Sequence, residues 1–521
     1  MMSAPHPLYE NIAGAATRFR SLLSQAQAVQ ERRLRTILRH NAGTEYGKSL
    51  GFAGIRDAAE YRARVPQTAY GDLHPLISRM ADGEADVLVA GKVLTLEETS
   101  GSTGGRKLIP YTAAGLDAFR RALTAWLDDL AITHPGIASG LSYWAISPVA
   151  RAPRATAGGI PIGLPGDATY LGERLAPLVA STLAVPPQTG MLTDIAEWRD
   201  TTCLYLLACE DLALVSVWSP TFFSGLLEHL QSEPMRLASL LEHGCGDIAP
   251  NESRAALALR VLMNSAPDLR ELWPRLALVS CWDQASSRPF ANALRRVLRG
   301  VPLQGKGLLA TEGVVSIPLS GMPMPVLAVD SAFYEFRDDA GRVQVAGEVS
   351  KGSDYEVLLT TESGLYRYAT GDRVRVHGFA DEAPLLEFVG RGAHVSDLCG
   401  EKLSEDFVTA GLAPLRLRFA LVAPAAAPRR GYSLFVDAAE VGGDGAAAIE
   451  ISAEQALCRN PQYAYARRLG QLAPLEVRRC VRPLETWLRV GLENGQRLSV
   501  VKPPALSTEH GWTSRFQGAV P

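Results

Sequence analysis

Short apolar segments alternate with amphipathic ones through the middle of the chain. Apolar runs of strand length lie at Leu141–Ile146, Cys203–Ala208, Leu212–Trp218 and Leu276–Cys281. Stretches with helical spacing separate them, for example at Phe119–Leu130 and Ala291–Leu298. Strands that alternate with helices are typical of α/β proteins, so this pattern predicts an α/β fold.

The regions on either side have other patterns. Leu34, Ile37 and Leu38 lie at helical spacing among arginines. This predicts an amphipathic helix that packs against a core and exposes its basic face, rather than one that binds a membrane. Residues 326–390 carry short β-type runs at Val326–Val329, Phe333–Phe336, Tyr355–Thr360 and Val374–His377. They predict an antiparallel or β-barrel-like part of the same large domain.

The last part of the chain reads as a separate small domain. Glycine-containing breaks occur at 390–392 and 400–402, and a strand pattern at Tyr432–Val436 is followed by a helical pattern that ends near Gln471. We therefore expect a large N-terminal domain over residues 1–396 and a small α+β domain over residues 397–521.

Composition narrows the possible partners and the location. The chain has 521 residues, of which 47% are hydrophobic, and this is ample for a large core. The formal net charge of −3 gives no basic field, so we expect no nucleic-acid partner. The seven cysteines are scattered without a Cys-x-x-Cys pair. That usage favours a reduced, cytoplasmic setting.

The hydropathy pattern predicts no membrane association. The longest apolar stretch, Cys203–Trp218, is interrupted by Glu210 and Asp211, so it predicts two buried strands joined by a polar turn. Met1–Glu10 lacks the basic and apolar regions of a secretory signal.

Residues 99–110 carry the most informative chemistry. They read Thr-Ser-Gly-Ser-Thr-Gly-Gly-Arg-Lys-Leu-Ile-Pro. Glycines let a backbone approach phosphates closely, hydroxyls and N–H groups donate to phosphate oxygens, and a lysine neutralises charge. The segment is not a Walker A loop, because Arg106 precedes Lys107 and Leu108 follows it. It therefore predicts a different polyphosphate loop, with an ordinary surface turn as the alternative.

Two carboxylates downstream fit the same chemistry. Glu312 lies beside Thr311 in the run Leu-Ala-Thr-Glu-Gly, and a carboxylate next to a hydroxyl can hold Mg²⁺ near phosphates. Asp372 ends the run Tyr-Arg-Tyr-Ala-Thr-Gly-Asp, and a carboxylate there can accept from two ribose hydroxyls. Considered singly, Glu312 could instead be an exposed turn residue, and Asp372 could belong to an ordinary Gly-Asp turn.

Taken in order, these segments resemble the adenylate-forming superfamily of acyl-CoA synthetases, luciferases and peptide-synthetase adenylation domains. The finer resemblance is to the acyl-acid amido synthetases of the auxin-responsive promoter family, in a bacterial-type form. It rests on residues 100–110 and 365–372, with further support from Val-Trp-Ser-Pro-Thr-Phe (217–222), Leu-Trp-Pro (272–274), Phe-Tyr-Glu-Phe (333–336), Glu-Phe-Val-Gly-Arg (387–391), Gly-Glu-Lys (400–402) and Asn-Pro-Gln-Tyr (460–463). The resemblance covers nearly the whole chain.

The resemblance implies a nucleotide site that is assembled from several segments. The expected phosphate loop consists of Ser100, Gly101, Ser102, Thr103, Gly104 and Lys107. Ala310, Thr311 and Glu312 would hold ATP, with Glu312 as the Mg²⁺ ligand, and Asp372 would bind the ribose.

The resemblance also implies a mobile small domain. Arg391 would mark the end of the large domain, and Lys402 would reach the nucleotide from just beyond a hinge near 391–402. Lys502 stands in a segment similar to the family's Lys-x-Pro-Arg and would enter the site when the small domain closes. With Lys107 and Glu312, Lys502 completes the expected catalytic set; a solvated terminal lysine is the alternative.

The implied activity is an ATP-dependent ligation by a monomer. A carboxylic acid would be adenylated with loss of pyrophosphate, and the acyl group would pass to the amine of an amino acid or a similar nucleophile. Transfer to a thiol of coenzyme A or a carrier protein is one alternative. A non-catalytic nucleotide-binding protein is another, because Leu308 replaces the family's adenine-stacking tyrosine and Ala505 replaces the arginine of Lys-x-Pro-Arg.

The acid is not determined by the sequence. Several aromatic residues follow core strands and could line an aromatic or long apolar pocket, although ordinary core packing explains each equally well. These residues are Tyr143, Trp144, Trp218, Phe222 and Trp282. An aromatic acid, an indole acid and a fatty acid all remain open.

Overall fold

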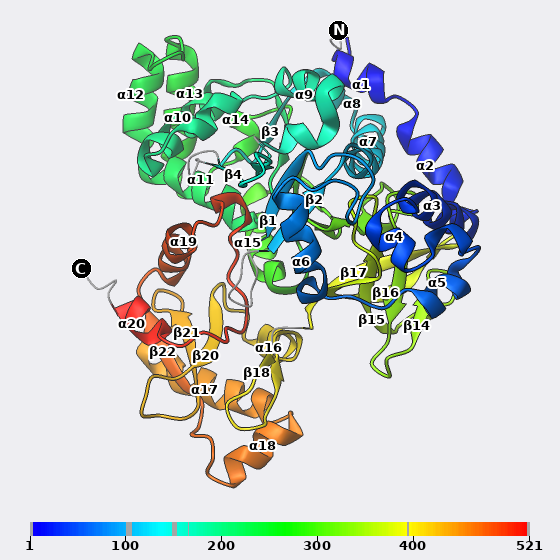
Figure 1. Ribbon diagram of the computed structural model, residues 1–521. Coiled ribbons are helices and arrows are strands. Elements are labelled where there is room, and N and C mark those ends of the chain that lie inside the picture. Colours follow the sequence, from blue (N-terminus) through cyan, green and yellow to red (C-terminus); the bar gives the residue numbers. More distant parts are fainter. Residues whose placement is uncertain (1–3, 100–106, 148–153, 165, 393–394, 518–521) are drawn as a thin grey trace. The chain divides into compact units, whose positions relative to one another are not determined.

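A computed structural model describes residues 4–99, 107–147, 154–164, 166–392 and 395–517. The contacts divide the chain into two compact units, which are described separately (Figure 1). Unit 1 comprises Met1–Trp218, Ser224–Cys281 and Leu298–Phe388, and unit 2 comprises Ser219–Phe223, Trp282–Val297 and Val389–Pro521. Two short segments from the middle of the sequence therefore belong with the C-terminal part. The domain boundary at residue 396 stays a prediction.

A four-stranded parallel sheet lies at the centre of the α/β part of unit 1. Its strand order is β3-β6-β7-β8, with bounds Leu141–Trp144, Leu212–Ser216, Leu278–Cys281 and Leu303–Gly305. All three neighbouring pairs are parallel. The α/β expectation is thereby confirmed, and the carboxyl ends of four strands meet along one edge.

An antiparallel sheet of seven strands forms the second layer of structure in unit 1. The order is β11-β12-β17-β16-β15-β13-β14, with bounds Ser316–Ile317, Val326–Leu327, Ala383–Arg391, Tyr368–Ala380, Asp354–Thr360, Phe333–Arg337 and Val343–Val345. The last three residues of β17, Val389–Arg391, are assigned to unit 2. The β-type runs expected in residues 326–390 are present, in an antiparallel arrangement.

Two smaller sheets carry the motif segments. The first has the order β2-β1-β5-β4, with bounds Lys107–Tyr111, Thr95–Thr99, Pro161–Ile162 and Arg154–Ala155. The second is the hairpin of β9 (Leu309–Ala310) and β10 (Gly313–Val314).

Helices surround these sheets. Those of unit 1 are α1 (Pro7–Ile12), α2 (Ala15–Leu23), α3 (Ala26–Asn41), α4 (Glu45–Ser49), α5 (Ala58–Arg64), α6 (Tyr70–Ala81), α7 (Ala113–Thr133), α8 (Pro135–Ser139), α9 (Gly172–Ala180), α10 (Ile195–Ala208), α12 (Pro234–His243), α13 (Glu252–Leu262) and α14 (Leu269–Leu272). α11 (Pro220–Ser232) and α15 (Arg288–Leu298) each have residues in both units. The described helices include none with the length and hydropathy of a membrane span.

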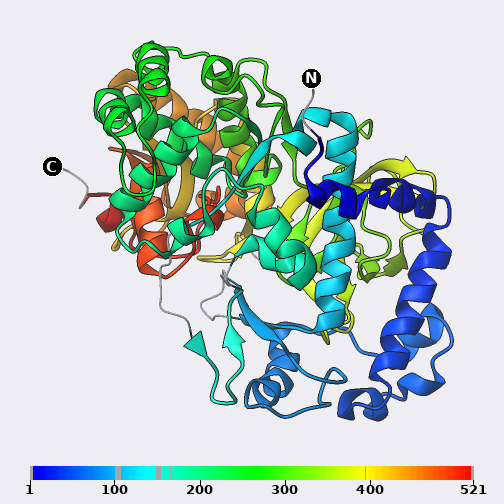
Figure 2. The same cartoon turned by 90° about the horizontal axis from the view of Figure 1, so that it is seen from above.

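Helix α7 organises the N-terminal helices. Figure 2 shows α1 and α2 (dark blue) beside α7 (cyan). α2 begins after Gly14 without a side-chain cap of its own, and buried Asp128 of α7 instead accepts from the Ala16 N–H at 2.9 Å. Asp129 of α7 pairs with Arg20 at 2.6 Å. Asp128 therefore satisfies the positive end of α2, and Asp129 pairs with a side chain of its last turn, so α7 holds α2 near both ends.

One predicted strand is a helix. Cys203–Ala208 forms the second half of α10, which begins with Asp194 accepting from the Glu197 N–H. Its last carbonyls are buried and accept from other side chains: Leu206 from the indole of Trp273, and Leu207 from the guanidinium of Arg254. A short apolar run does not by itself distinguish a strand from a helix buried on all sides, and the capping groups decide here.

Unit 2 is an α+β arrangement. A three-stranded sheet has the order β20-β21-β22, with bounds Ala420–Pro424, Tyr432–Asp437 and Glu476–Cys480. A two-stranded pair, β18 (Val395–Ser396) and β19 (Leu403–Ser404), precedes it. Its helices are α16 (Glu405–Leu412), α17 (Gly443–Leu457), α18 (Pro461–Arg468), α19 (Pro483–Glu493) and α20 (Trp512–Gln517).

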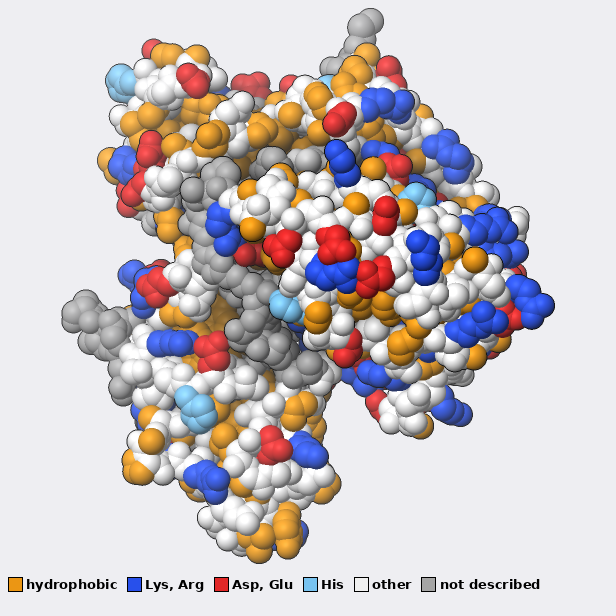
Figure 3. Space-filling model, in the orientation of Figure 1, with side chains coloured by type: hydrophobic (Ala, Val, Ile, Leu, Met, Phe, Trp, Pro, Cys, Tyr) orange, Lys and Arg blue, Asp and Glu red, His pale blue; other side chains and the backbone are white. Residues whose placement is uncertain are grey.

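Charge on the surface of unit 1 is mixed in sign. Figure 3 shows Lys and Arg side chains interspersed with Asp and Glu side chains. Many of these form ion pairs, for example Arg79 with both Glu45 and Glu84. Pairs of this kind are exposed and contribute little stability individually.

A buried ion pair in unit 1 is different. Arg367 donates to Glu335 at 2.9 Å, and the two side chains are 6% and 1% exposed. Arg367 also donates to the carbonyls of Arg62 and Val65. The pair therefore ties the antiparallel sheet to the end of α5.

We expect Glu335→Gln to lower the free energy of unfolding by about 3 kcal/mol, because it leaves the buried Arg367 charge without its counter-charge. Urea unfolding followed by circular dichroism measures the change. Asp339→Asn is the matched control, since Asp339 pairs with Arg373 while 79% exposed, and it should cost less than about 1 kcal/mol. Equal effects would contradict the prediction.

Candidate active site

The predicted phosphate loop joins two paired strands. β1 and β2 are antiparallel, and Thr99 lies opposite Lys107. Ser100, Gly101, Ser102, Thr103 and Gly104 lie outside the described residues, so their role stays a prediction. The two residues that flank the loop are paired across the sheet, and a short connecting loop requires such a pairing.

Lys107 is the first residue of β2 and is positioned by α6. Its Nζ lies 5.8 Å from the ring centroid of Tyr70. The Tyr70 hydroxyl accepts from the Leu108 N–H at 2.8 Å. Tyr70 therefore contacts both the side chain of the lysine and the strand that carries it.

Glu312 lies in a tight turn. Ala310 pairs with Gly313 across the β9–β10 hairpin, so Thr311 and Glu312 are the two turn residues. The Glu312 side chain is only 6% exposed, which differs from the exposed turn residue considered as the alternative. The hydroxyl of Tyr111, at the end of β2, donates to the Thr311 carbonyl at 2.6 Å. This bond connects the glutamate turn to the strand that follows the loop.

A polar cavity of about 360 Å³ surrounds this turn. Its lining combines hydroxyl and carboxylate groups with small residues, including Tyr111, Thr311, Glu312, Thr361 and Ser363. Burial raises the pKa of Tyr111 well above its usual range, and the nearby carboxylates of Glu97 and Glu312 raise it further. The phenol is therefore a hydrogen-bond donor at any working pH.

Asp372 lies in an irregular part of β16. The register of β15 and β16 shifts between Glu356 and Leu358, and Gly371 opposite the shift has φ 77°. The Thr370 hydroxyl donates to the Val357 carbonyl at 3.0 Å. Asp372 is 1% exposed. A bulge of this kind redirects a side chain and is frequent beside functional sites.

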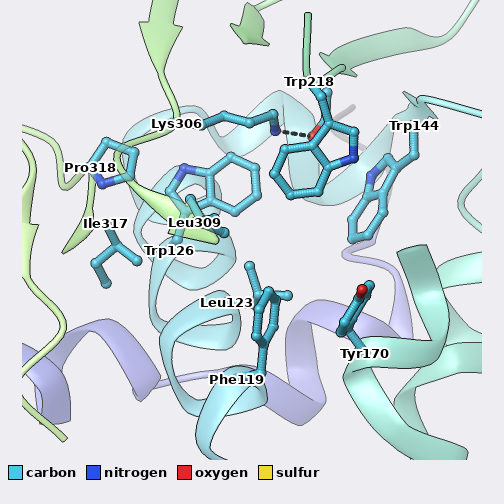
Figure 4. Close-up of a pocket in the computed structure, with 11 residues that line it drawn as sticks. Phe119, Leu123, Trp126, Trp144, Tyr170, Trp218, Lys306, Leu309, Ile317 and Pro318 are labelled. Atoms are coloured by element: carbon cyan, nitrogen blue, oxygen red, sulfur yellow. Dashed lines mark hydrogen bonds between the residues drawn. The ribbon is translucent and has the colours of Figure 1, made fainter. Parts of the chain in front are cut away.

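An apolar cavity of about 520 Å³ lies at the carboxyl edge of the parallel sheet (Figure 4). Trp144 ends β3, Ser216 ends β6, Trp218 follows it, and Lys306 follows β8. Phe119, Leu123 and Trp126 face them from α7 at helical spacing. Ligands of parallel α/β sheets bind at this edge, because loops there enclose space that the strands do not fill.

The predicted aromatic pocket residues separate into two groups. Trp144 and Trp218 line the apolar cavity. Tyr143 is fully buried, and because successive strand residues point to opposite faces, its ring packs on the other face of β3 from Trp144. Phe222 and Trp282 belong to unit 2.

Lys306 was not anticipated from the sequence. Its side chain is 6% exposed, and its Nζ donates to the Ser216 hydroxyl at 2.7 Å. The same Nζ lies 4.8 Å from the ring centroid of Trp126 and 5.3 Å from that of Trp218. The only signal in the sequence was the Gly-Lys-Gly turn at 305–307, in which Gly307 has φ 74° and no room for a Cβ beside Ser316.

Three predicted site residues, Arg391, Lys402 and Lys502, belong to unit 2. The Lys502 Nζ lies 5.1 Å from the ring centroid of Trp282. Burial raises the pKa of Glu405 at the start of α16, while the positive charges of Lys502 and Arg391 act in the opposite direction. Lys402 is exposed and has φ 45°. Lys502, Arg391 and Glu405 are thus electrostatically linked within this unit.

The two positions that depart from the family pattern have structural roles. The Leu308 N–H donates to the Ser316 hydroxyl at 3.0 Å, and its side chain is 9% exposed in the core. The Ala505 carbonyl accepts from the Val422 N–H at 2.8 Å. At both positions a backbone hydrogen bond fixes the chain, and this bond does not depend on which side chain is present.

Comparison with known families decides the relationship. Residues 15–303 match the GH3 family N-terminal domain, and residues 325–391 match the GH3 family central domain. The chain belongs to the GH3 family. Residues 99–110 and 365–372 lie in the matched parts, whereas Lys306 and Glu312 lie between them. The resemblance inferred from the motifs is confirmed. A bacterial-type origin stays a prediction.

Curated relatives of this GH3 protein are amido synthetases. A probable indole-3-acetic acid-amido synthetase of Oryza sativa subsp. japonica is 28% identical over 456 residues, covering 74% of this chain and 72% of the relative. Another from Arabidopsis thaliana is 25% identical over 429 residues, covering 77% of this chain and 72% of the relative. The GH3 family is a family of amido synthetase ligases, so the ligase class predicted from the motifs is confirmed.

Solved structures share the fold. The AtGH3.15 acyl acid amido synthetase in complex with 2,4-DB superposes with a TM-score of 0.86 at 22% identity, covering 97% of this chain and 96% of that chain. A 2-hydroxyisobutyryl-CoA ligase in its postadenylation state gives 0.54 at 12% identity, covering 90% of this chain and 92% of that chain. The mixed α/β GH3 fold, related to that of adenylate-forming ligases, is confirmed.

We expect Tyr111→Phe to lower the free energy of unfolding of this GH3 protein by about 1 to 3 kcal/mol, because it leaves the Thr311 carbonyl without its donor. Urea unfolding gives the value. In the control Tyr61→Phe, the lost partner is the Thr360 hydroxyl, which can rotate and also accepts from the Arg367 N–H. The control should cost less, and a larger loss there would contradict the role assigned to Tyr111.

Proposed function

We propose that this protein is an ATP-dependent acyl acid amido synthetase. The observation that carries the proposal is the pairing of two cavities within unit 1. One is polar and surrounds Glu312, the other is apolar and aromatic, and the Phe119 side chain lines both. An enzyme that joins a nucleotide phosphate to an apolar acid needs these two environments side by side.

In the proposed first step, the carboxylate of the acid attacks the α-phosphate of ATP. A bond forms between the carboxylate oxygen and phosphorus, and the bond to pyrophosphate breaks. We assign the phosphates to Lys107 and the loop residues Ser100–Gly104, and the nucleotide to Ala310, Thr311 and Asp372. Such a step depends on positioning and on neutralising phosphate charge, for which a lysine and N–H-rich loop are suited.

The residues near Glu312 suit Mg²⁺. The buried Glu312 and its chain neighbour Thr311 line one cavity, and hard oxygen donors of their kind are the ligands that Mg²⁺ prefers. The described residues contain no cluster of three or more His, Cys, Asp or Glu that could hold a metal alone. This agrees with a site that one carboxylate completes together with substrate phosphates. When bound, the ion would supply charge stabilisation at the phosphates.

In the proposed second step, an amine attacks the activated carbonyl and AMP leaves. We assign Lys502 and Lys402 to this part of the cycle, with Arg391 at the junction, and we propose that residues 397–521 turn about 391–402 between the steps. An amine of an amino acid is the preferred acceptor, since the named relatives are amido synthetases. A thiol acceptor is the alternative outcome of the product analysis below.

We further propose that the apolar cavity takes the acid. Trp144 and Trp218 are its aromatic walls, and a largely apolar lining with a few polar groups is typical of small-molecule sites. A monomeric, cytoplasmic enzyme remains our expectation.

We expect Lys107→Ala and Glu312→Gln each to lower pyrophosphate release by about a hundredfold or more, since each removes a charge that faces the phosphates or their counter-ion. The assay combines ATP, Mg²⁺ and a panel of carboxylic acids. Lys92→Ala and Glu173→Gln change exposed residues of the same types and should leave the rate unchanged. Near-normal turnover of either site variant would remove that residue from the mechanism.

The product identifies the acceptor. With mixed amino acids we expect an amide by mass spectrometry that withstands neutral hydroxylamine, because amides are poorer acyl donors than thioesters. A hydroxylamine-sensitive product formed with coenzyme A would favour the thiol alternative. No pyrophosphate across a broad panel of acids would favour a non-catalytic nucleotide-binding protein.

A further inference from the structure

The apolar cavity contains one cation among rings. Apart from Ser216, Lys306 and the Tyr170 hydroxyl, the described residues that line it contribute hydrocarbon or indole surface, and no carboxylate is among them. A buried ammonium loses most of its hydration and needs hydrogen bonds to the protein or to a ligand in exchange. A purely apolar acid would bind better to a methionine or leucine at this position.

The lysine is held in place by several contacts. Its Nζ donates to Ser216 and lies over the faces of Trp126 and Trp218 (Figure 4). The Trp126 ring is itself fixed, because its indole N–H donates to the Gln304 side chain at 2.8 Å. Gln304 lies in β8, two residues before Lys306. The ammonium is therefore preorganised rather than mobile.

We propose that Lys306 is a specificity-determining residue that selects acids carrying a second oxygen acceptor on an aromatic or similarly flat body. The indole rings would hold the body, and Lys306 would donate to a carboxylate, hydroxyl or carbonyl oxygen remote from the reacting carboxylate. This inference rests on the proposed function of the cavity as the acid site, and it specifies the class of acid.

The reacting carboxylate is the less suitable partner for Lys306. That carboxylate loses its negative charge when its oxygen bonds to phosphorus, so a cation bound to it would favour the substrate over the transition state. A remote acceptor keeps its interaction with Lys306 in the acid and in the adenylate alike. The polar cavity around Glu312, on the other side of Phe119, is the region assigned to the phosphates.

The test compares matched acids on the wild type and on Lys306→Met. The acids are para-carboxyphenylacetate, para-hydroxyphenylacetate and para-methylphenylacetate, which differ only in the group remote from the reacting carboxylate. Binding is measured without ATP by quenching of tryptophan fluorescence, since three tryptophans line the cavity. Pyrophosphate release is measured separately. The control Lys92→Met changes an exposed lysine.

We expect the wild type to bind the two acceptor-bearing acids at least about tenfold more tightly than the methyl analogue, as a charge-assisted hydrogen bond in a dry site provides. Lys306→Met should reverse this order, and Lys92→Met should not. Ser216→Ala should keep the order with weaker binding, because the charge remains but loses its anchor. Circular dichroism checks that each variant is folded. The comparison of the three acids on the wild type does not depend on any variant.

Two results would overturn the inference. If the wild type does not distinguish the acids, or if Lys306→Met weakens all of them equally, Lys306 does not recognise a remote acceptor. If the acids bind in the expected order but release no pyrophosphate, the assignment of Lys306 holds and the proposed amido synthetase function fails. Binding and turnover thus test the two proposals separately.

Discussion

Four parallel strands end at one edge of a sheet in unit 1, and the chemistry of this part of the molecule depends on that constraint. The residues that end or follow β3, β6 and β8 are distant in sequence but converge there. Hydrogen bonding satisfies the backbone inside the sheet, so the loops beyond its edge are free to present side chains. Helix α7 closes the space from the opposite side with three apolar residues of one helical face.

Two hairpins extend this arrangement toward the polar cavity. In the β1–β2 hairpin the loop ends are paired, and in the β9–β10 hairpin only two residues form the turn. The Tyr111 hydroxyl links them through the Thr311 carbonyl. Because burial raises the pKa of this phenol, it stays protonated and donates to the Thr311 carbonyl. A rigid connection of this kind suits a site in which positioning contributes most of the rate.

Sequence reasoning succeeded where the signal was local and failed where it was not. Helix α3 follows from periodicity, because one buried face dictates the spacing of its apolar residues. Strands β6, β7, β15 and β21 follow from short apolar runs bounded by polar or turn residues. The run Cys203–Ala208 was misassigned, since burial on all sides removes that periodicity and the deciding groups, Arg254 and Trp273, come from elsewhere in the chain. Lys306 was missed because its Gly-Lys-Gly turn looks like any exposed turn.

The sequence by itself determined the family, the order of the motif segments and the type of most elements. These depend on residue identity and on spacing within a few turns of chain. Only the tertiary structure decided that Glu312 is buried, that Trp144 rather than Tyr143 faces the apolar cavity, and that Lys306 lies between Trp126 and Trp218. The physical reason is that a buried charge and its surroundings are set by contacts between segments some 90 to 180 residues apart, which no local pattern records.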